Sequence, residues 1–175
     1  MKYDLLVRKL NTIEEKYITS DKIEEYCSIV ELEYYDAIIY LTRHKYLYTI
    51  FKGIFYKPSI AERKLKSIKI DHFEAVSAGL GIKGIKNWYF ALETALKFNG
   101  MTHEFFAVDF IINDTICRVN PMTILGNKIK FIKTKPRLMN FGMKKTGHFK
   151  YSDVEKTVLD MIYLKRYDGI KGEAL

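Results

Sequence analysis

A set of basic and aromatic side chains in the first third of the chain has the chemistry to hold a nucleic acid. Its members are Tyr35, Arg43, Lys45, Tyr48, Lys52 and Lys57. Lysine and arginine attract phosphates, and tyrosine adds a hydroxyl and an aromatic face, so the set favours contact with double-stranded DNA. Such contact requires that these side chains share one surface, which depends on the elements that carry them.

Two short helices are expected to position the first of these residues. Helix starts favour Thr19, Ser20 and Asp21, because a short side-chain oxygen accepts hydrogen bonds from the free N–H groups of a first turn. Apolar residues follow at helical spacing, the spacing breaks at residues 28–30, and it resumes over residues 32–41. This pattern predicts a helix, a tight turn and a second helix.

A β-hairpin is expected after the second helix. Residues 46–51 and 54–56 are rich in aromatic and β-branched side chains, which favour strands. Lys52 and Gly53 separate the two runs, and a glycine there can supply the positive φ of a tight turn. The order of helix, turn, helix and hairpin predicts a winged helix-turn-helix domain over residues 1–58. The same elements would also suit a plain packing subdomain or a protein-binding module, because a fold alone does not establish a function.

The start of the second helix is acidic, which is unusual for an element that reads DNA. Glu31, Glu33 and Asp36 lie where a helix-turn-helix protein places side chains in the major groove. Carboxylates there face a polyanion and are unfavourable unless they accept from cytosine amino groups. The sequence leaves open whether this acidic turn abolishes DNA binding.

The net positive charge lies in the other part of the chain. Residues 1–58 contain nine Lys or Arg and nine Asp or Glu, so the whole formal charge of +8 comes from residues 59–175. No carboxylate side chain occurs between Asp114 and Asp153. We expect a basic strip in this region, formed by Lys128, Lys130, Lys133, Lys135, Arg137, Lys144 and Lys145.

A strand over residues 128–131 would carry lysines on one face and apolar side chains on the other, because side chains alternate across a strand. Three uses of the strip stay open. It could bind phosphates with strong salt dependence, attract an acidic protein partner, or be a solvated edge strand whose lysines prevent mispairing. The sequence does not choose among them.

The second part of the chain predicts an α/β domain over residues 59–175, with a boundary near Pro58 and Ser59. Short helices are expected over residues 60–66 and 72–78. Glycines 79, 81 and 84 are expected to form a turn and not a phosphate-binding loop, because no strand leads into them and no Gly-Lys-Ser/Thr follows.

Further helices are expected over residues 88–98 and from Ser152, where Ser152 and Glu155 fit a capping box. Strands are expected over residues 104–112, 116–119, 128–133 and within 138–143, with a hairpin turn at Asn113-Asp114. The expected fold class is therefore α+β: a winged helix-turn-helix, followed by an α/β domain with a small, mostly antiparallel sheet and flanking helices.

Catalytic and metal-binding chemistry is not expected. The four histidines and two cysteines lack the spacing of metal ligands, and no nucleophile motif is present. Glu104 and Asp109 have opposite parity on one expected strand, so they would face opposite sides and not form a nuclease pair. We expect no catalytic residue, no cofactor, no metal and no enzymatic activity.

The sequence also bears on compartment. No apolar stretch is long enough to cross a bilayer, and the N-terminus lacks the apolar core of a signal peptide, so we expect a cytoplasmic protein with no membrane partner. Cys27 and Cys117 each lie in an apolar pattern, which predicts two reduced, buried thiols.

Three segments resemble the AbiEi-type antitoxins of type IV toxin–antitoxin systems. Residues 152–160, Ser-Asp-Val-Glu-Lys-Thr-Val-Leu-Asp, are similar to the family's late signature S-x-x-E-[RK]-T-[LV]-L-D. Residues 51–56 resemble its R-[RK]-G-[VI]-Y run, and residues 89–96 resemble its helix with S-A-L, in the family's order. Glu155 and Asp160 match the signature acids, and we expect capping and packing roles for them.

The resemblance implies a winged helix that represses its own operon and a C-terminal domain that neutralises a nucleotidyltransferase toxin. The first hypothesis is therefore a cytoplasmic transcriptional regulator that binds operator DNA. The alternative is a protein-interaction adaptor whose winged helix no longer binds DNA and whose acidic turn meets a basic partner. The sequence does not determine the operator, the oligomeric state or the existence of a toxin.

Overall fold

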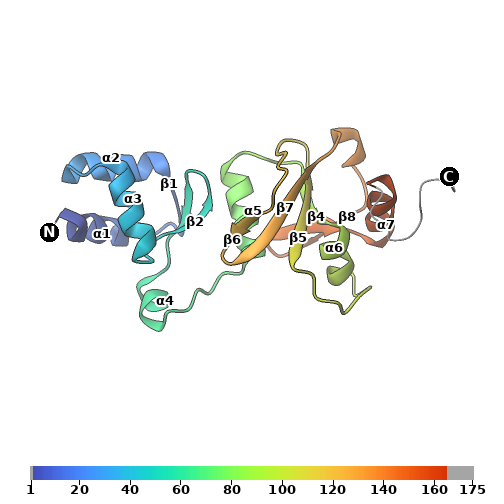
Figure 1. The fold of residues 1–175 in the computed structure, drawn as a ribbon, viewed down its shortest axis with the longest axis horizontal. Helices are drawn as coiled ribbons and strands as arrows, with labels where there is room; N and C mark the ends of the chain where they lie inside the picture. Colours follow the sequence, from blue (N-terminus) through green and yellow to red (C-terminus); the bar gives the residue numbers. More distant parts are fainter. Residues whose placement is uncertain (1, 165–175) are drawn as a thin grey trace. The chain divides into compact units, whose positions relative to one another are not determined.

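The computed structural model of the protein describes residues 2–164 (Figure 1). These residues form a mixed α+β structure with a three-stranded and a six-stranded sheet. Contacts divide the chain into two compact units, Met1–Lys83 and Gly84–Leu175, which we call the first unit and the second unit.

The first unit begins with a helix and a strand that the sequence analysis missed. Helix α1 spans Lys2–Thr12, and strand β1 spans Tyr17–Thr19. Leu6 and Leu10 of α1 are buried one turn apart, so this helix supplies one wall of the core.

Helices α2 (Ser20–Val30) and α3 (Tyr34–Arg43) occupy the two segments where helices were expected. Ile23 and Cys27 of α2 are buried in the same core as Leu41 of α3. Glu31 takes left-handed backbone with φ 52, which ends α2 and turns the chain toward α3.

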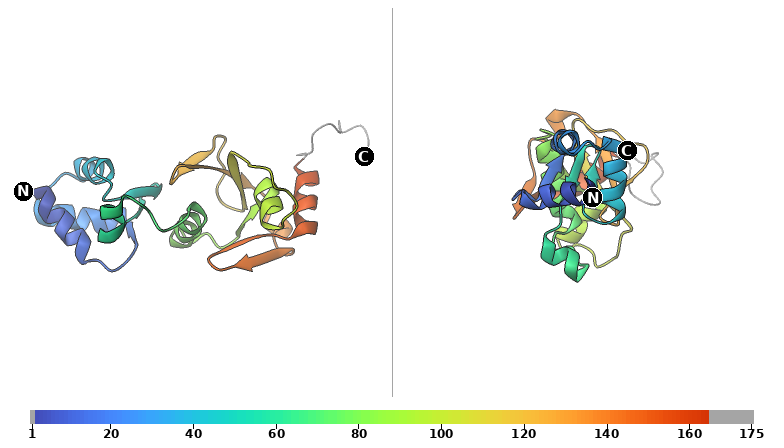
Figure 2. Two further views of the ribbon diagram at one scale, coloured as in Figure 1. Left: turned by 90° about the horizontal axis from the view of Figure 1, so that it is seen from below. Right: turned by 90° about the vertical axis from the view of Figure 1, so that its left-hand side faces the viewer.

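The expected hairpin is present as β2 (Tyr48–Phe51) and β3 (Ile54–Tyr56). Gly53 has φ +79, as the tight turn requires. Strand β1 pairs antiparallel with β3 on its other side, so the sheet order is β1-β3-β2. Helices α1, α2 and α3 gather at one end of this sheet (Figures 1 and 2).

The division between the units lies after Lys83, and not near Pro58 and Ser59 as expected. Helices α4 (Ile60–Leu65) and α5 (His72–Ile82) belong to the first unit, because α5 packs against β2 and β3. Gly79 permits this packing: a Cβ at that position would lie 2.5 Å from the ring of Phe51. Glycines 79 and 81 therefore lie inside a helix, which contradicts the expected turn.

The second unit contains a mixed sheet with strand order β6-β7-β5-β4-β9-β8. Its elements are β4 (Trp88–Ala91), α6 (Leu92–Phe98), β5 (Val108–Asn113), β6 (Met122–Ile124), β7 (Asn127–Lys133), the 3-10 helix η1 (Pro136–Leu138), β8 (Met143–Thr146), β9 (Phe149–Ser152) and α7 (Val154–Tyr163). The β4–β9 and β5–β7 pairs are parallel and the other three pairs are antiparallel, so the sheet is mixed, with antiparallel pairs in the majority. Helices α6 and α7 lie side by side (Figure 1).

Residues 88–98 form a strand and then a helix, so the single helix expected there is wrong. All four residues of β4 are buried, because β4 lies between β5 and β9 with both faces covered. A fully buried strand has no polar alternation, and its sequence resembles that of a buried helix. Leu92 has φ 55, which turns the chain from β4 into α6.

The hairpin expected at Asn113-Asp114 is also wrong, because β5 pairs in parallel with β7. The buried side chain of Asn113 holds the chain in a turn: its oxygen accepts from the backbone N–H groups of Thr115 and Ile116. The strand expected over residues 116–119 does not form.

Helix α7 starts one residue later than the expected capping box requires. Asp153 is the N-cap, and its side chain accepts from the backbone N–H of Lys156 at 2.8 Å. Ser152 is buried, with its hydroxyl 2.7 Å from that of Thr157, and Glu155 is exposed. Ser152 therefore anchors β9 to α7 instead of capping the helix.

The two cysteines differ in their exposure. Cys27 is buried as expected, whereas Cys117 is exposed in the loop between β5 and β6.

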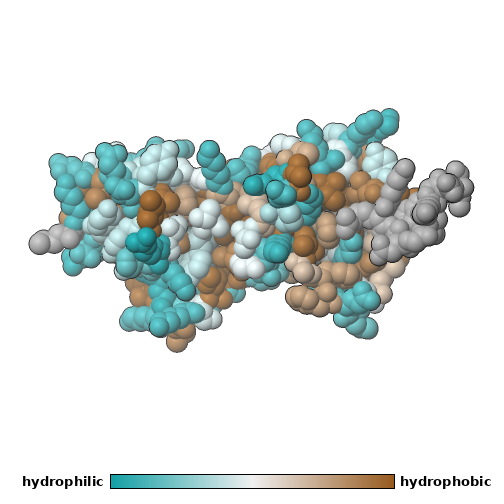
Figure 3. Space-filling view, in the orientation of Figure 1, coloured by the Kyte–Doolittle hydropathy of each residue, from teal (hydrophilic) through white to brown (hydrophobic). Residues whose placement is uncertain are grey.

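None of the helices within residues 2–164 is both long and apolar enough to cross a membrane. On the face shown in Figure 3, hydrophilic residues dominate the surface over α1, α2 and α3.

Candidate nucleic-acid interface

Helix α3 exposes a row of side chains one helical turn apart. Tyr35 is 78% exposed, Ile39 is 54% exposed, and Arg43 at the end of the helix is also exposed. Ala37 and Leu41 on the opposite side are fully buried. The sequence analysis named Tyr35 and Arg43 but missed Ile39, because Ile38 beside it fits the apolar spacing equally well.

Of the acidic residues before and within the first turn of α3, at least one carboxylate is paired with a lysine. Glu31 accepts a hydrogen bond from Lys2 of α1 at 3.0 Å, and the same ammonium donates to the Glu31 carbonyl. Glu33 is the N-cap of α3 and Asp36 lies in its first turn, where carboxylates stabilise the helix dipole. The outward-facing acidity is therefore that of Glu33 and Asp36.

The hairpin and the turn before it carry three of the expected DNA-binding residues. Lys52 is exposed in the β2–β3 turn, and Tyr48 is half-buried at the start of β2. Lys45 lies between α3 and β2 with φ 57, a left-handed conformation that non-glycine residues seldom adopt.

Lys57 was expected to contact DNA, but it is occupied inside the first unit. Its ammonium donates to the carbonyls of Leu10 and Ile13, just where α1 ends. Burial lowers the pKa of Lys57, and the nearby Arg63 lowers it further. Lys57 thus fixes α1 to the end of β3 and does not belong to an outer binding face.

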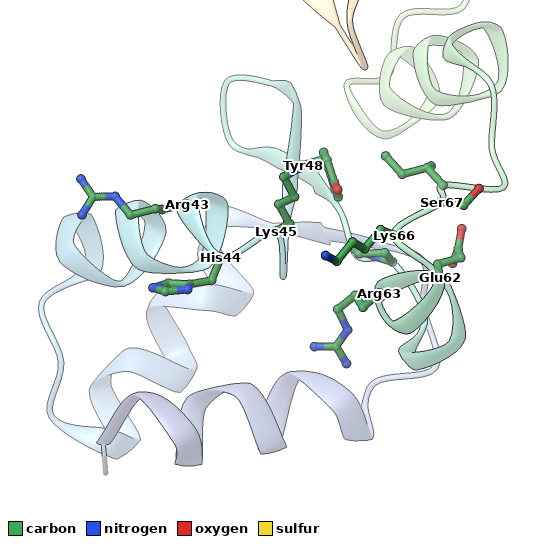
Figure 4. A pocket seen from close by; sticks show the side chains of 10 residues that line it. Arg43, His44, Lys45, Tyr48, Glu62, Arg63, Lys66 and Ser67 are labelled. Carbon is green, nitrogen blue, oxygen red and sulfur yellow. The ribbon is translucent and has the colours of Figure 1, made fainter.

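A basic pocket lies between the end of α3, the start of β2 and helix α4 (Figure 4). Its volume is about 340 Å³. Its lining residues are Arg43, His44, Lys45, Tyr48, Pro58, Glu62, Arg63, Lys66, Ser67 and Ile68. Four of these carry a permanent positive charge and one is a carboxylate. Arg63 and Lys66 extend from the α4 side toward the end of α3, whereas the Glu62 side chain points the other way (Figure 4).

Glu62 accepts three hydrogen bonds from the protein and forms no ion pair with a pocket cation in the described part of the chain. Its carboxylate accepts from the Tyr56 hydroxyl at 2.7 Å and from the backbone N–H groups of Ser59 and Lys69 at 2.8 Å each. Burial alone would raise the pKa of Glu62, but these donors lower it to about 2. The carboxylate therefore ties α4 to the hairpin.

Arg63 is held in place by neutral groups. Its guanidinium lies 5.0 Å from the centre of the Tyr46 ring and donates to the side-chain oxygen of Asn11 at 2.5 Å. Its Nε atom is buried and has no hydrogen-bond partner among residues 2–164. Arg63 and Lys66 were missed by the sequence analysis, which assigned them to a connecting helix; their only signal was the basic run in residues 63–66.

The expected basic strip of the second unit is split over separate strands. Lys128, Lys130 and Lys133 lie on β7, Lys135 follows it and Arg137 lies in η1. Lys144 and Lys145 lie on β8, and β5, β4 and β9 separate β8 from β7. The seven residues therefore do not form one continuous row.

Several cations of the second unit bind backbone or side-chain oxygens of the protein itself. Lys130 donates to the carbonyls of Arg118 and Val119, and Lys150 donates to the carbonyl of Lys86. Lys144 donates to the side chain of Asn99. Because β7 lies between β6 and β5, the edge-strand alternative for residues 128–131 is wrong.

The signature segment of residues 152–160 forms a buried network. Lys156 is 2% exposed and pairs with Asp160 one turn later, and the Tyr89 hydroxyl donates to the same carboxylate at 2.9 Å. Burial raises the pKa of Asp160, although both donors act to lower it. The Lys156 ammonium also lies 5.0 Å from the centre of the Phe141 ring. These contacts join α7 to β4, in agreement with the packing role expected for Asp160.

No group of three or more His, Cys, Asp or Glu with the arrangement of a metal site occurs among residues 2–164. Asp109 accepts from the Thr94 hydroxyl at 3.1 Å. The absence of enzymatic activity, metal and cofactor stays a prediction.

Comparisons with known proteins give a likeness of fold only. No protein-family model matches the sequence, and no curated protein matches it. A crystal structure of the Rv2827c protein from Mycobacterium tuberculosis is similar, with a TM-score of 0.60 over 91% of this chain and 59% of that chain. The sequence identity is 12%. The chain thus spans less than two thirds of that protein, and the likeness concerns the fold alone.

Proposed function

We propose that the first unit is a winged-helix module that binds double-stranded DNA and that the protein acts as a transcriptional regulator. The observation that carries this proposal is the order of α2, α3 and the β2–β3 hairpin, with β1 completing the sheet. Arg43, Lys45 and Lys52 supply cations at the end of α3, after it and on the hairpin. In this class of module, the second helix enters the major groove and flanking elements contact the backbone.

The exposed row on α3 gives the proposal its chemistry. Ile39 can pack against a thymine methyl group, and Arg43 can bind a guanine edge or a phosphate. Glu33 and Asp36 would repel phosphates but can accept from cytosine amino groups. We therefore expect a sequence-specific reader with weak affinity for DNA that lacks its site.

A salt series on DNA binding tests the proposal. Fluorescence anisotropy should show a preferred duplex, selected from a random library, whose affinity falls steeply with salt. The double variant Arg43→Glu with Lys52→Glu should lower the affinity for the duplex by at least about 100-fold, because both changes place a negative charge beside the DNA phosphates. A reversal that leaves affinity unchanged would reject the winged-helix interface.

The resemblance to AbiEi-type antitoxins extends the proposal to a second role. In that role the protein represses its own operon, and the second unit neutralises a nucleotidyltransferase toxin. Helix α7 exposes Val158, Leu159 and Ile162 at 42%, 50% and 46%, an apolar face that suits a protein partner. A nucleotidyltransferase encoded next to this protein should be toxic alone and harmless on co-expression, and Val158→Glu with Ile162→Glu should restore the toxicity.

The alternative function is a protein-interaction adaptor. The exposed Glu33 and Asp36 favour it, because a basic protein would bind this turn better than DNA would. The same salt series separates the two functions: an adaptor should bind duplexes weakly and without preference for a site.

A further inference from the structure

We infer that the basic pocket between α3, β2 and α4 is a preformed site for a phosphate group. The inference rests on the proposed function, and it adds a second DNA-binding element, α4, to the helix and hairpin of that proposal. The ligand chemistry is a phosphate oxyanion, which can come from a DNA backbone or from a small phosphorylated molecule.

The charge of the pocket favours an anion. Lys45, Arg63 and Lys66 line it, and none of them lies within ion-pair distance of a carboxylate in the described part of the chain. Glu62, its one carboxylate, is buried and accepts from three donors of the protein itself. Uncompensated cations around a concave surface raise the local concentration of anions.

Arg63 is positioned before any ligand arrives. Its stacking on Tyr46 and its hydrogen bond to Asn11 fix the guanidinium without neutralising its charge. A guanidinium held by neutral groups loses little conformational freedom on binding, and its remaining N–H groups can donate to phosphate oxygens. The buried Nε atom has no hydrogen-bond partner in the part of the chain that the structure describes.

The backbone conformation of two pocket lysines is uncommon for residues other than glycine. Lys45 and Lys66 have φ 57 and φ 51, and they are two of the five non-glycine residues with positive φ in the described part of the chain. Each follows the end of a helix, a position where glycine is the usual residue. Residues kept in a strained conformation concentrate at functional sites. If these lysines served only to stabilise the helix dipoles, a concave site between them would not be needed.

The test compares Lys66→Gln with Lys64→Gln. Lys66 lines the pocket, whereas Lys64 is exposed on α4 outside it, so the pair changes the same charge on neighbouring positions. Two probes are used with each full-length variant: the selected duplex, in an anisotropy salt series, and inorganic pyrophosphate, followed by the backbone amide signals of Lys45, Lys66 and Ser67 in NMR spectra. Circular dichroism checks that both variants keep the fold.

We expect Lys66→Gln to weaken duplex binding about 5- to 10-fold and to reduce the salt slope by about one, and Lys64→Gln to change neither. That result supports the site with a DNA phosphate as its ligand. If the wild type binds no duplex but pyrophosphate shifts the three amides with saturation, and Lys66→Gln removes the shifts, the winged-helix proposal fails while the phosphate site stands with a small molecule as its ligand. The inference is overturned if neither probe affects the three amides, or if the two variants behave alike with both probes.

Discussion

The two units of this protein differ in whether their unpaired cations gather on one surface. The first unit has 14 Lys or Arg against 12 Asp or Glu, and four of these cations line one concave surface without a carboxylate partner among residues 2–164. The second unit has 15 Lys or Arg against 9 Asp or Glu, but Lys130 and Lys150 donate to backbone carbonyls and Lys156 is buried in an ion pair. Net charge along a sequence therefore does not show where unpaired cations gather in space, and we propose a binding surface where they do.

The two buried carboxylates show the same contrast. Glu62 of the first unit is held by an O–H and two N–H donors, which together bring its pKa to about 2. Asp160 of the second unit is paired with a lysine, and burial raises its pKa. The first unit thus keeps its pocket cations free of the nearest carboxylate, whereas the second unit directs a cation inward for packing.

The largest expected effect concerns the inward-facing cation of the second unit. Asp160→Ala leaves the Lys156 ammonium buried without its charged partner, and we expect a loss of roughly 3–5 kcal/mol in the free energy of unfolding. Urea denaturation of the variant measures it. As a control, Glu155→Ala changes an exposed carboxylate on the same helix and should have little effect. A small loss for Asp160→Ala would mean that the pair does not hold α7 to β4.

A similar but pH-dependent effect is expected at Glu62. Its folded pKa lies below the ordinary value of 4.5, so its contribution is complete above about pH 4.5 and is lost as the pH falls toward 2. Glu62→Gln should therefore cost roughly 3 kcal/mol near neutral pH and much less near pH 2. Thermal unfolding at several pH values measures the difference. Equal destabilisation at both ends of the pH range would contradict this account of the carboxylate.

A smaller effect, with opposite signs for stability and binding, is expected at Lys45. Lys45→Gly should stabilise the first unit by roughly 0.5–1 kcal/mol, because glycine adopts the left-handed conformation without strain. The same change should weaken duplex binding several-fold, because it removes a cation of the pocket. Parallel measurements of unfolding and of DNA affinity test both signs. If the variant binds as well as the wild type, the strain at this position serves packing alone.

The smallest effect is expected for the second unit's surface lysines. Lys128→Glu with Lys145→Glu should change duplex affinity less than about threefold, because the two residues lie on strands separated by three others and do not converge. The matched comparison is the double reversal at Arg43 and Lys52, which changes the same total charge. Equal losses from the two double variants would remove the distinction between the units.

The sequence by itself determined helices α2 and α3 and the β2–β3 hairpin of the first unit, although it did not reveal α1 and β1. Good helix starters, helical spacing of apolar residues and a glycine between two strand-forming runs are local signals, and α2, α3 and the β2–β3 hairpin follow them. The same kind of signal located Tyr35, Arg43 and Lys52 on the exposed faces of these elements. Local chemistry sufficed because each of these features depends on residues within a few positions of one another.

Only the tertiary structure decided the rest. Strand β4 resembled a helix because burial on both faces removes polar alternation, and the parallel pairing of β5 with β7 depends on residues distant in the sequence. Lys57 was expected at the interface but binds the end of α1, while Arg63 and Lys66 line the pocket although the short helix expected over residues 60–66 was given no binding role. Contacts between distant segments decide which cations bind groups of the protein itself and which stay unpaired. A linear pattern carries no information on those contacts.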